Sequence, residues 1–131
     1  MVTKPMQKIP KPTAAELNIL SVLWKLGPST VRSVHEVLSS VEPSGYTTAL
    51  KMLQVMHHKG LVVRDDSQRA HVYSAAVSKL HTQREFLNDL VSKLFDGSTS
   101  EMVLEALGSA PRADSKEMDK IRDLIRELED K

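Results

Sequence analysis

The chain is 131 residues long, contains no cysteine and few aromatic residues, and carries a formal net charge of +1. That length suits one compact domain or a small domain with an appendage. The absence of cysteine excludes disulfide bonds and thiolate metal sites and favours a reducing, cytoplasmic location. No apolar run approaches the roughly 18 residues of a membrane span, and the N-terminal segment 1–12 lacks the hydrophobic stretch of a secretory signal.

The charge is unevenly distributed along the chain. Residues 1–64 hold eight Lys and Arg against three Asp and Glu, whereas residues 78–131 hold nine against twelve. A basic first half indicates an anionic partner for that half. Chance and charged tails would give the same distribution, so charge alone leaves both interpretations open.

The first predicted helix begins at a capping box formed by Thr13 and Glu16. It ends at Gly27, which is followed by a proline. The segment before it, residues 1–12, is rich in proline and lysine and is predicted to form a flexible arm.

Two further helices follow before the sequence pattern changes. One is predicted at about residues 30–39, and a polar loop comes after it. Ser44 is predicted to cap the other helix, which runs to Lys59 and stops at Gly60. Apolar residues recur along both helices at helical spacing, which gives each helix one apolar face.

Two short β-rich segments come next, at residues 61–64 and 70–74, and the polar stretch between them predicts a hairpin. Residues 78–95 then read as a long amphipathic helix. A second capping box at Ser98 opens a short helix, and Asp114 caps the last helix.

Three helices followed by a hairpin are the architecture of a winged helix-turn-helix domain, whose third helix reads DNA. The sequence therefore predicts a mainly α protein. Residues 1–77 form a winged-helix DNA-binding domain of three helices and a two-stranded wing. Residues 78–131 form a second, helical module that is too thin to fold well alone.

The third predicted helix has an apolar face and a polar face. Ala49, Met52, Leu53 and Met56 form the apolar face. The polar face carries Thr, Lys, Gln and His, and no acidic residue occurs from residue 44 to 64. Thr and Gln can hydrogen-bond base edges, a Thr methyl group suits thymine, and Lys suits phosphate or guanine. A merely solvated face is the competing interpretation, but such faces more often carry Glu–Lys pairs. The candidate DNA-binding residues are Tyr46, Thr47, Thr48, Lys51, Gln54, His58 and, from the wing, Arg69.

Gln68 and Arg69 lie near the predicted tip of the hairpin, within reach of phosphate or the minor groove. Asp65 and Asp66 oppose such a contact. Arg69 is therefore expected to be the only strong contact of the wing, and an arginine in plain solvent is the alternative.

The sequence contains no motif that indicates an enzyme: no glycine-rich nucleotide loop, no zinc-protease motif and no serine-hydrolase motif. His57 and His58 are adjacent, so they diverge by about 100° on a helix. A composite metal site from His35, His57, His71 and His81 stays open, but their spacing gives it no support. We expect no enzymatic activity, no cofactor and no metal.

Four segments, taken in chain order, resemble one known family. They are TAAELNILSVLWKLGPSTVRSVHEVL in the first two helices, YTTALKMLQVMHHKGLVVRD in the third helix and first wing strand, RAHVYSAAVSK in the second wing strand, and FDGSTSEMVLEAL at the start of the C-terminal region. Over nearly its whole length the chain is similar to the penicillinase-repressor family, the bacterial winged-helix repressors of the BlaI, MecI and CopY type.

This resemblance implies a homodimer that binds palindromic operator DNA and represses transcription, for example of a β-lactamase, antibiotic-response or related operon. It also implies that the C-terminal helices interlock between two chains, which agrees with their apolar stripes. The residues expected to form the dimer are Phe86, Leu87, Leu90, Leu94, Met102, Leu104, Ile121, Leu124, Ile125 and Leu128.

The chain also departs from the family. Members that control β-lactamase genes are cleaved at an Asn-Phe pair after a membrane metalloprotease receptor signals, and this chain has Glu105-Ala106 there. The departure counts against cleavage at this bond and leaves a membrane-sensor-linked protease open as a partner. Copper-responsive members carry C-terminal cysteines that this chain lacks, and many members have Arg at the position of Val55.

Two other functions stay open beside the repressor. One is a winged-helix protein-interaction module without specific DNA binding, which needs no basic, acid-free third helix. The other is a regulator that responds to a small molecule or metal bound between the two modules.

Overall fold

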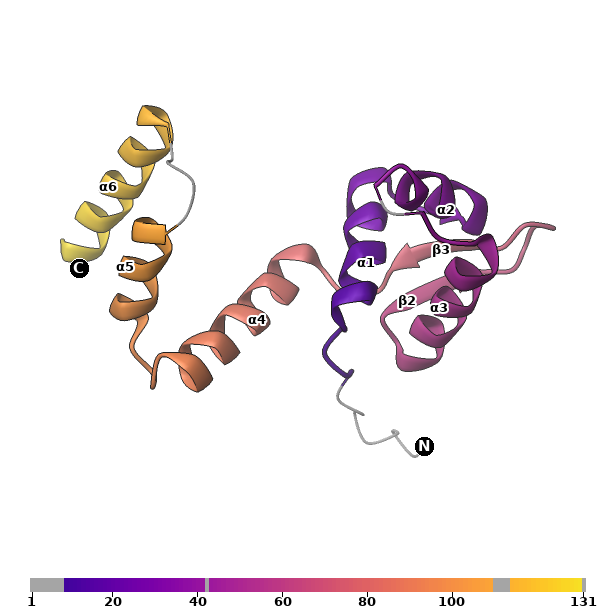
Figure 1. Ribbon diagram of the computed structural model, residues 1–131, viewed down its shortest axis with the longest axis horizontal. Helices are drawn as coiled ribbons and strands as arrows, with labels where there is room; N and C mark the ends of the chain where they lie inside the picture. Colours follow the sequence, from indigo (N-terminus) through magenta and orange to yellow (C-terminus); the bar gives the residue numbers. More distant parts are fainter. Residues whose placement is uncertain (1–8, 42, 110–113, 131) are drawn as a thin grey trace. The chain divides into compact units, whose positions relative to one another are not determined.

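The computed structural model describes residues 9–41, 43–109 and 114–130. In these ranges the chain forms six helices and three strands, shown in Figure 1. Their order is α1 (Ala14–Leu26), β1 (Ser29–Thr30), α2 (Val31–Ser39), α3 (Tyr46–Lys59), β2 (Val62–Asp65), β3 (Val72–Ala75), α4 (Lys79–Leu94), α5 (Thr99–Ser109) and α6 (Ser115–Glu129). The chain divides into two compact units, residues 1–84 and 85–131.

Local hydrogen bonds set the starts of the first two helices. The Thr13 hydroxyl accepts from the Glu16 N–H at 3.2 Å, and the Thr13 N–H donates to the Glu16 carboxylate at 2.9 Å. This is the predicted capping box, which satisfies two backbone donors at the start of α1. Thr30 caps α2 in the same manner, because its hydroxyl accepts from the Ser33 N–H at 3.2 Å. Both predicted starts are confirmed.

The two ends of α3 differ in how they are closed. The N-cap is Gly45, which makes no side-chain hydrogen bond, so the predicted cap by Ser44 is wrong. Ser44 lies one residue before the cap position, and its backbone carbonyl is bound by His35 instead. At the other end Gly60 is left-handed, with φ of 89°, and confirms the predicted stop.

The strands form one antiparallel sheet in the order β1-β3-β2. The predicted hairpin is confirmed, with its strands one or two residues later than predicted. β1 was not predicted, because two residues between two helices carry no alternating pattern. It forms because the tertiary fold places Ser29 opposite Tyr73 and Thr30 opposite Val72.

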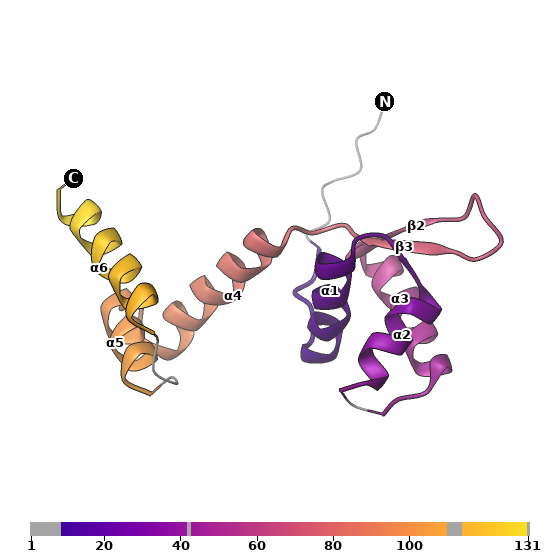
Figure 2. The same ribbon diagram turned by 90° about the horizontal axis from the view of Figure 1, so that it is seen from above.

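The core of the first unit lies between the three helices and the sheet. Figure 2 shows α1, α2 and α3 on one side of the β2–β3 hairpin. Apolar side chains from all of these elements meet there and are removed from water, which is the main stabilising contribution. The buried apolar residues are Ile19, Leu20, Val22, Leu23, Val31, Val34, Ala49, Leu53, Met56, Leu61, Val62 and Tyr73.

One hydrogen bond ties the chain after the sheet back to α1. The Trp24 indole N–H donates to the Val77 carbonyl at 2.9 Å. Because these residues are far apart in sequence, the bond anchors the end of the wing to the helical core.

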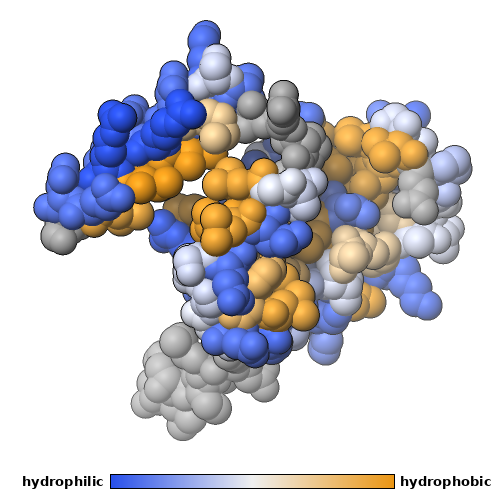
Figure 3. Space-filling model, turned by 60° about the vertical axis from the view of Figure 1, so that its left-hand side comes forward, coloured by the Kyte–Doolittle hydropathy of each residue, from blue (hydrophilic) through white to orange (hydrophobic). Residues whose placement is uncertain are grey.

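The described residues of the second unit form no buried core. No described residue from 85 to 130 is buried. Leu94 and Leu104 are 72% and 70% exposed, and Figure 3 shows orange hydrophobic side chains open at the surface beside blue hydrophilic ones. Its helices still have well-formed ends: Ser98 accepts from the Glu101 N–H at 3.1 Å, and Asp114 accepts from the Glu117 N–H at 2.8 Å.

The turn before α5 also follows the prediction. Asp96 and Gly97 stop α4 with positive φ angles of 48° and 83°. Within the described residues, none of the helices combines the length and the apolarity that a bilayer crossing requires.

Candidate nucleic-acid interface

α3 presents a polar face to solvent and buries the opposite face. Ala49, Leu53 and Met56 are at most 2% exposed and anchor the helix in the core. The helical repeat then turns the intervening residues outward. The predicted DNA-facing residues of this helix are all exposed: Tyr46, Thr47, Thr48, Lys51, Gln54 and His58. We call Thr47, Thr48, Lys51, Gln54 and His58 the polar face of α3.

The lysines of α3 are in different electrostatic situations. Lys59 donates to the Glu16 carboxylate at 2.8 Å, and the Glu16 side chain is only 5% exposed. Lys51 is exposed and forms no salt bridge with another described residue. The polar face of α3 therefore keeps a positive charge that the fold does not neutralise.

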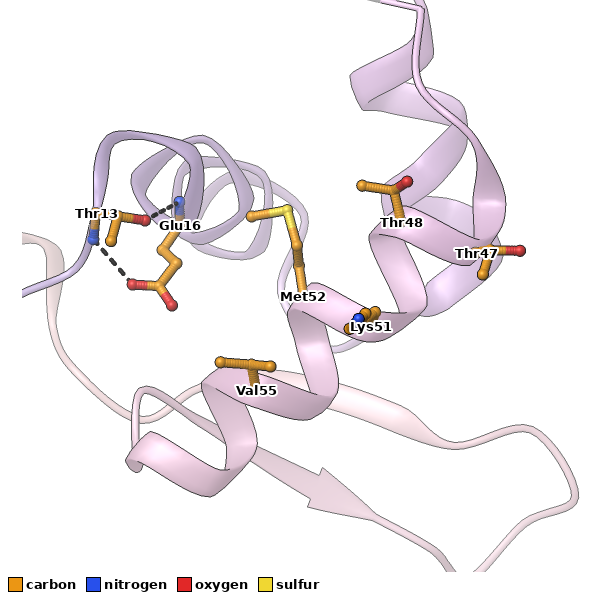
Figure 4. Close-up of a pocket in the computed structure, with 7 residues that line it drawn as sticks. All are labelled: Thr13, Glu16, Thr47, Thr48, Lys51, Met52 and Val55. Atoms are coloured by element: carbon orange, nitrogen blue, oxygen red, sulfur yellow. Dashed lines mark hydrogen bonds between the residues drawn. The ribbon is translucent and has the colours of Figure 1, made fainter.

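The carboxylate of Glu16 stays ionised in its buried place. Burial alone raises the pKa of Glu16, but the hydrogen bonds from Lys59 and the Thr13 backbone together outweigh burial, so its pKa lies below the usual value. Figure 4 shows Glu16 beside a hollow between the start of α1 and α3, of about 320 Å³. In the same view Met52 points across the hollow toward α1, whereas Thr47 points away from α1.

The two acidic residues of the wing, Asp65 and Asp66, interact with other residues of the wing. Asp66 lies 2.7 Å from Nε of Arg64 and 3.6 Å from Nε2 of His71. Hydrogen bonds from the hydroxyl and the N–H of Ser67 lower the pKa of Asp65. Both carboxylates are thus engaged by neighbours.

Gln68 and Arg69 lie in the turn between β2 and β3, and both are exposed. Arg69 forms no salt bridge with another residue in the described ranges. Asp66 is paired with Arg64, which offsets part of its negative charge. The wing acids therefore repel a phosphate less than the sequence alone suggested.

Tyr46, the first residue of α3, is 47% exposed. Its ring meets the ring of His35 edge to face, with centroids 5.9 Å apart. Nε2 of His35 also lies 2.8 Å from the Ser44 carbonyl oxygen. The sequence indicated His35 only as one member of a composite metal site, because no local pattern links residue 35 to residue 44.

The metal ligands considered from sequence do not gather. Among the described residues, no group of three or more His, Asp or Glu side chains is arranged to hold a metal ion.

The predicted dimerisation residues all lie on the helices that follow the wing. Seven of the ten are exposed: Leu87, Leu90, Leu94, Leu104, Leu124, Ile125 and Leu128. Phe86, Met102 and Ile121 are half-buried.

The order of the elements, the buried and polar faces of α3, and the antiparallel hairpin after it define a winged helix-turn-helix protein. This is the fold class predicted from the sequence.

Comparisons with known proteins narrow this class. A sequence model of the penicillinase repressor family matches residues 12–127. Transcriptional regulator BlaI of Mycobacterium tuberculosis is 29% identical over 125 residues, which are 95% of this chain and 89% of that protein. The penicillinase repressor of Bacillus licheniformis is 26% identical over 102 residues, which are 78% of this chain and 80% of that protein.

A solved structure agrees with the fold. The solution structure of the DNA binding domain of the repressor BlaI matches with a TM-score of 0.51 and 28% identity, over 56% of this chain and 90% of that chain. The chain belongs to the penicillinase repressor family, because the family match extends over most of its length. The relatives are a transcriptional regulator and a repressor and not enzymes, which confirms the prediction of a protein without enzymatic activity.

Proposed function

We propose that the protein is a dimeric transcriptional repressor that binds palindromic operator DNA. The observation that carries this proposal is the polar face of α3, which is exposed, free of acidic residues and held opposite a buried apolar face. In helix-turn-helix proteins this helix enters the major groove. The names of the relatives, a transcriptional regulator and a penicillinase repressor, support the same function.

The side chains of this surface suit different parts of a DNA duplex. Thr47 and Thr48 are in the first turn of α3, where side chains of a reading helix approach base edges. Lys51 suits a phosphate or a guanine, and Gln54 suits an adenine. Tyr46 and His58 lie on the same helix and Arg69 lies in the turn of the wing, and all three suit phosphates.

The dimer is proposed from the state of the second unit. A set of helices with no buried described residue and many exposed leucines does not reach the stability of a folded domain alone. A second copy of the chain covers these apolar side chains and pairs two DNA-binding domains on two half-sites. In this proposal the DNA-binding domain is residues 1–77, and residues 78–131 form the dimer.

The kind of gene that the protein regulates is proposed only from the names of its relatives. The name of the Bacillus licheniformis protein supports a β-lactamase, antibiotic-response or related operon. A protease linked to a membrane sensor stays a prediction, and Glu105-Ala106 at the expected cleavage place counts against cleavage of that bond.

The proposal is tested by fluorescence anisotropy of the purified protein on DNA from upstream of its own gene and on scrambled DNA, across a salt series. We expect a Kd of roughly 10⁻⁸ M or tighter at physiological salt and a preference of ~10³ over scrambled DNA. Weak binding that is equal on both DNAs would contradict an operator at this place and favour the protein-interaction module.

A further inference from the structure

The helix proposed to read DNA begins without a side-chain cap. Gly45 at its N-cap makes no side-chain hydrogen bond, and the first backbone bond of the helix, from the Ala49 N–H to the Gly45 carbonyl, is 3.3 Å long. An uncapped first turn leaves backbone donors unsatisfied and frays easily. Tyr46, Thr47 and Thr48 stand in this turn, so the part of α3 closest to the bases needs another restraint.

α2 supplies contacts on both sides of the cap position. Nε2 of His35 lies 2.8 Å from the Ser44 carbonyl oxygen, just before Gly45. A carbonyl only accepts, so Nε2 must carry the hydrogen in this bond. The His35 ring also meets the Tyr46 ring edge to face, with planes at 82°, just after Gly45. The Ser39 hydroxyl reaches the same carbonyl from 3.4 Å.

We propose that His35 is a positioning residue for DNA binding, which holds the first turn of α3 in its reading geometry through the Ser44 carbonyl and the Tyr46 ring. This inference rests on the proposed function that α3 reads operator DNA. His35 spans the turn between α2 and α3, so it couples the start of the reading helix to a helix whose Val34 is fully buried. A first turn that is ordered before binding lowers the entropy cost of binding.

This role has a distinctive signature. Attraction of lysine and arginine to phosphates depends on charge and is independent of sequence, whereas base contacts depend on the placement of side chains. Loss of His35 should therefore weaken operator binding and leave binding to scrambled DNA and its salt slope unchanged. A general loss of folding would weaken both.

The test uses the full chain with His35→Ala, His35→Gln and a matched control, in anisotropy titrations under one buffer condition. His35→Gln retains an N–H donor. Ser40→Ala is the control, because it removes the hydrogen bond of 2.7 Å that the Ser40 hydroxyl, at the C-cap of α2, donates to the Val37 carbonyl. We expect His35→Ala to raise the operator Kd by roughly two- to tenfold, the range of one net hydrogen bond. His35→Gln should recover part of this loss, and Ser40→Ala should bind like the wild type.

A second measurement needs no DNA. Amide hydrogen exchange at Ala49 should be faster in His35→Ala than in the wild type, while exchange at Leu53 in the middle of α3 stays the same. If the wild type prefers its operator but His35→Ala keeps both the operator Kd and the Ala49 exchange rate, the inference about His35 is wrong. If the wild type itself shows no preference for the operator, the proposed function fails, and the Ala49 exchange rate then shows separately whether His35 holds the turn.

Discussion

Lys51 and Lys59 lie on the same helix and yet contribute differently. Lys59 donates to the buried Glu16 carboxylate at 2.8 Å, so its charge serves the fold. Lys51 is exposed and forms no salt bridge in the part of the chain that the structure describes. Its charge is available to a phosphate at almost no cost in stability, which makes it the sharpest single-residue probe of the proposed surface.

We expect Lys51→Ala to weaken binding to operator and scrambled DNA alike, because a phosphate contact is independent of sequence. The slope of log K against log salt should fall by about one. Anisotropy titrations across a salt series measure both effects. Lys25→Ala, which removes an exposed lysine in the last turn of α1, is the control and should keep the wild-type slope. An unchanged slope in Lys51→Ala would remove Lys51 from the interface, and a loss confined to the operator would assign it to a base.

The elements of the first unit are joined by a few polar contacts over long sequence distances. The ion pair of Glu16 and Lys59 connects the first turn of α1 to the last turn of α3, and Trp24 connects α1 to the chain after β3. These two contacts tie α1 to the end of α3 and to the chain after the sheet. The Glu16 carboxylate already takes part in the capping box, so its loss of charge affects two elements together.

We expect Lys59→Met to lower the free energy of unfolding by about 2 kcal/mol at pH 7, because the buried carboxylate loses its partner. Fully buried pairs cost ~3–5 kcal/mol when broken, and the value is smaller here because the Lys59 side chain is 31% exposed. Urea unfolding measures it. Lys25→Met, at an exposed position, should stay within about 0.5 kcal/mol of the wild type. A loss equal to this control would mean that the ion pair contributes nothing.

The same ion pair predicts a dependence on pH. The folded-state pKa of Glu16 is lowered, so its stabilisation is fully present above the unfolded value of 4.5 and is lost as the pH falls through the folded pKa. The difference between wild type and Lys59→Met should therefore shrink below about pH 4.5. A difference that is constant down to pH 2 would assign the effect of Lys59 to packing.

For the full chain, the two units differ in whether they can be stable alone. The first has a core of twelve buried apolar residues, whereas no described residue from 85 to 130 is buried. Leu104 is 70% exposed in a single chain, so replacing it with a charged residue costs little within one chain. In the proposed dimer, the same substitution puts a charge where two chains meet and is costly.

We expect Leu104→Glu to raise the dimer dissociation constant at least about tenfold, because a leucine is lost from the interface in each chain. Sedimentation equilibrium measures the dissociation constant. Glu105→Gln, at the next exposed position, should stay dimeric. The fragment 1–77 should be monomeric and bind an operator poorly, since half-site pairing is lost. A monomeric wild type, or a fragment that dimerises as well as the full chain, would refute the proposed dimer.

Much of the secondary structure follows from contacts within four residues along the chain. The Thr13–Glu16 capping box, the glycine stop at Gly60 and the polar face of α3 are of this kind, and all were predicted correctly. Local hydrogen bonds and helical periodicity depend only on residues that are close together in the sequence, so they can be predicted from it. The predicted cap position of α3, Ser44, was wrong by one residue, because the cap is Gly45. The exact end of a helix is less strongly encoded in the local sequence than the helix itself.

Contacts between segments that are distant in the sequence were not predicted. They account for the features of the fold that local patterns do not determine. The strand β1 exists because the core brings Ser29 beside Tyr73. Lys59 is paired with a carboxylate because the packing of α1 on α3 brings it to Glu16, and His35 reaches Ser44 because α2 packs beside the start of α3. The amino-acid order therefore settles which face of α3 is polar, since that requires only the helical repeat. Packing decides which charges of α3 stay unpaired and which contacts hold its first turn. The groups that form these contacts are distant in sequence, and burial of the core brings them together.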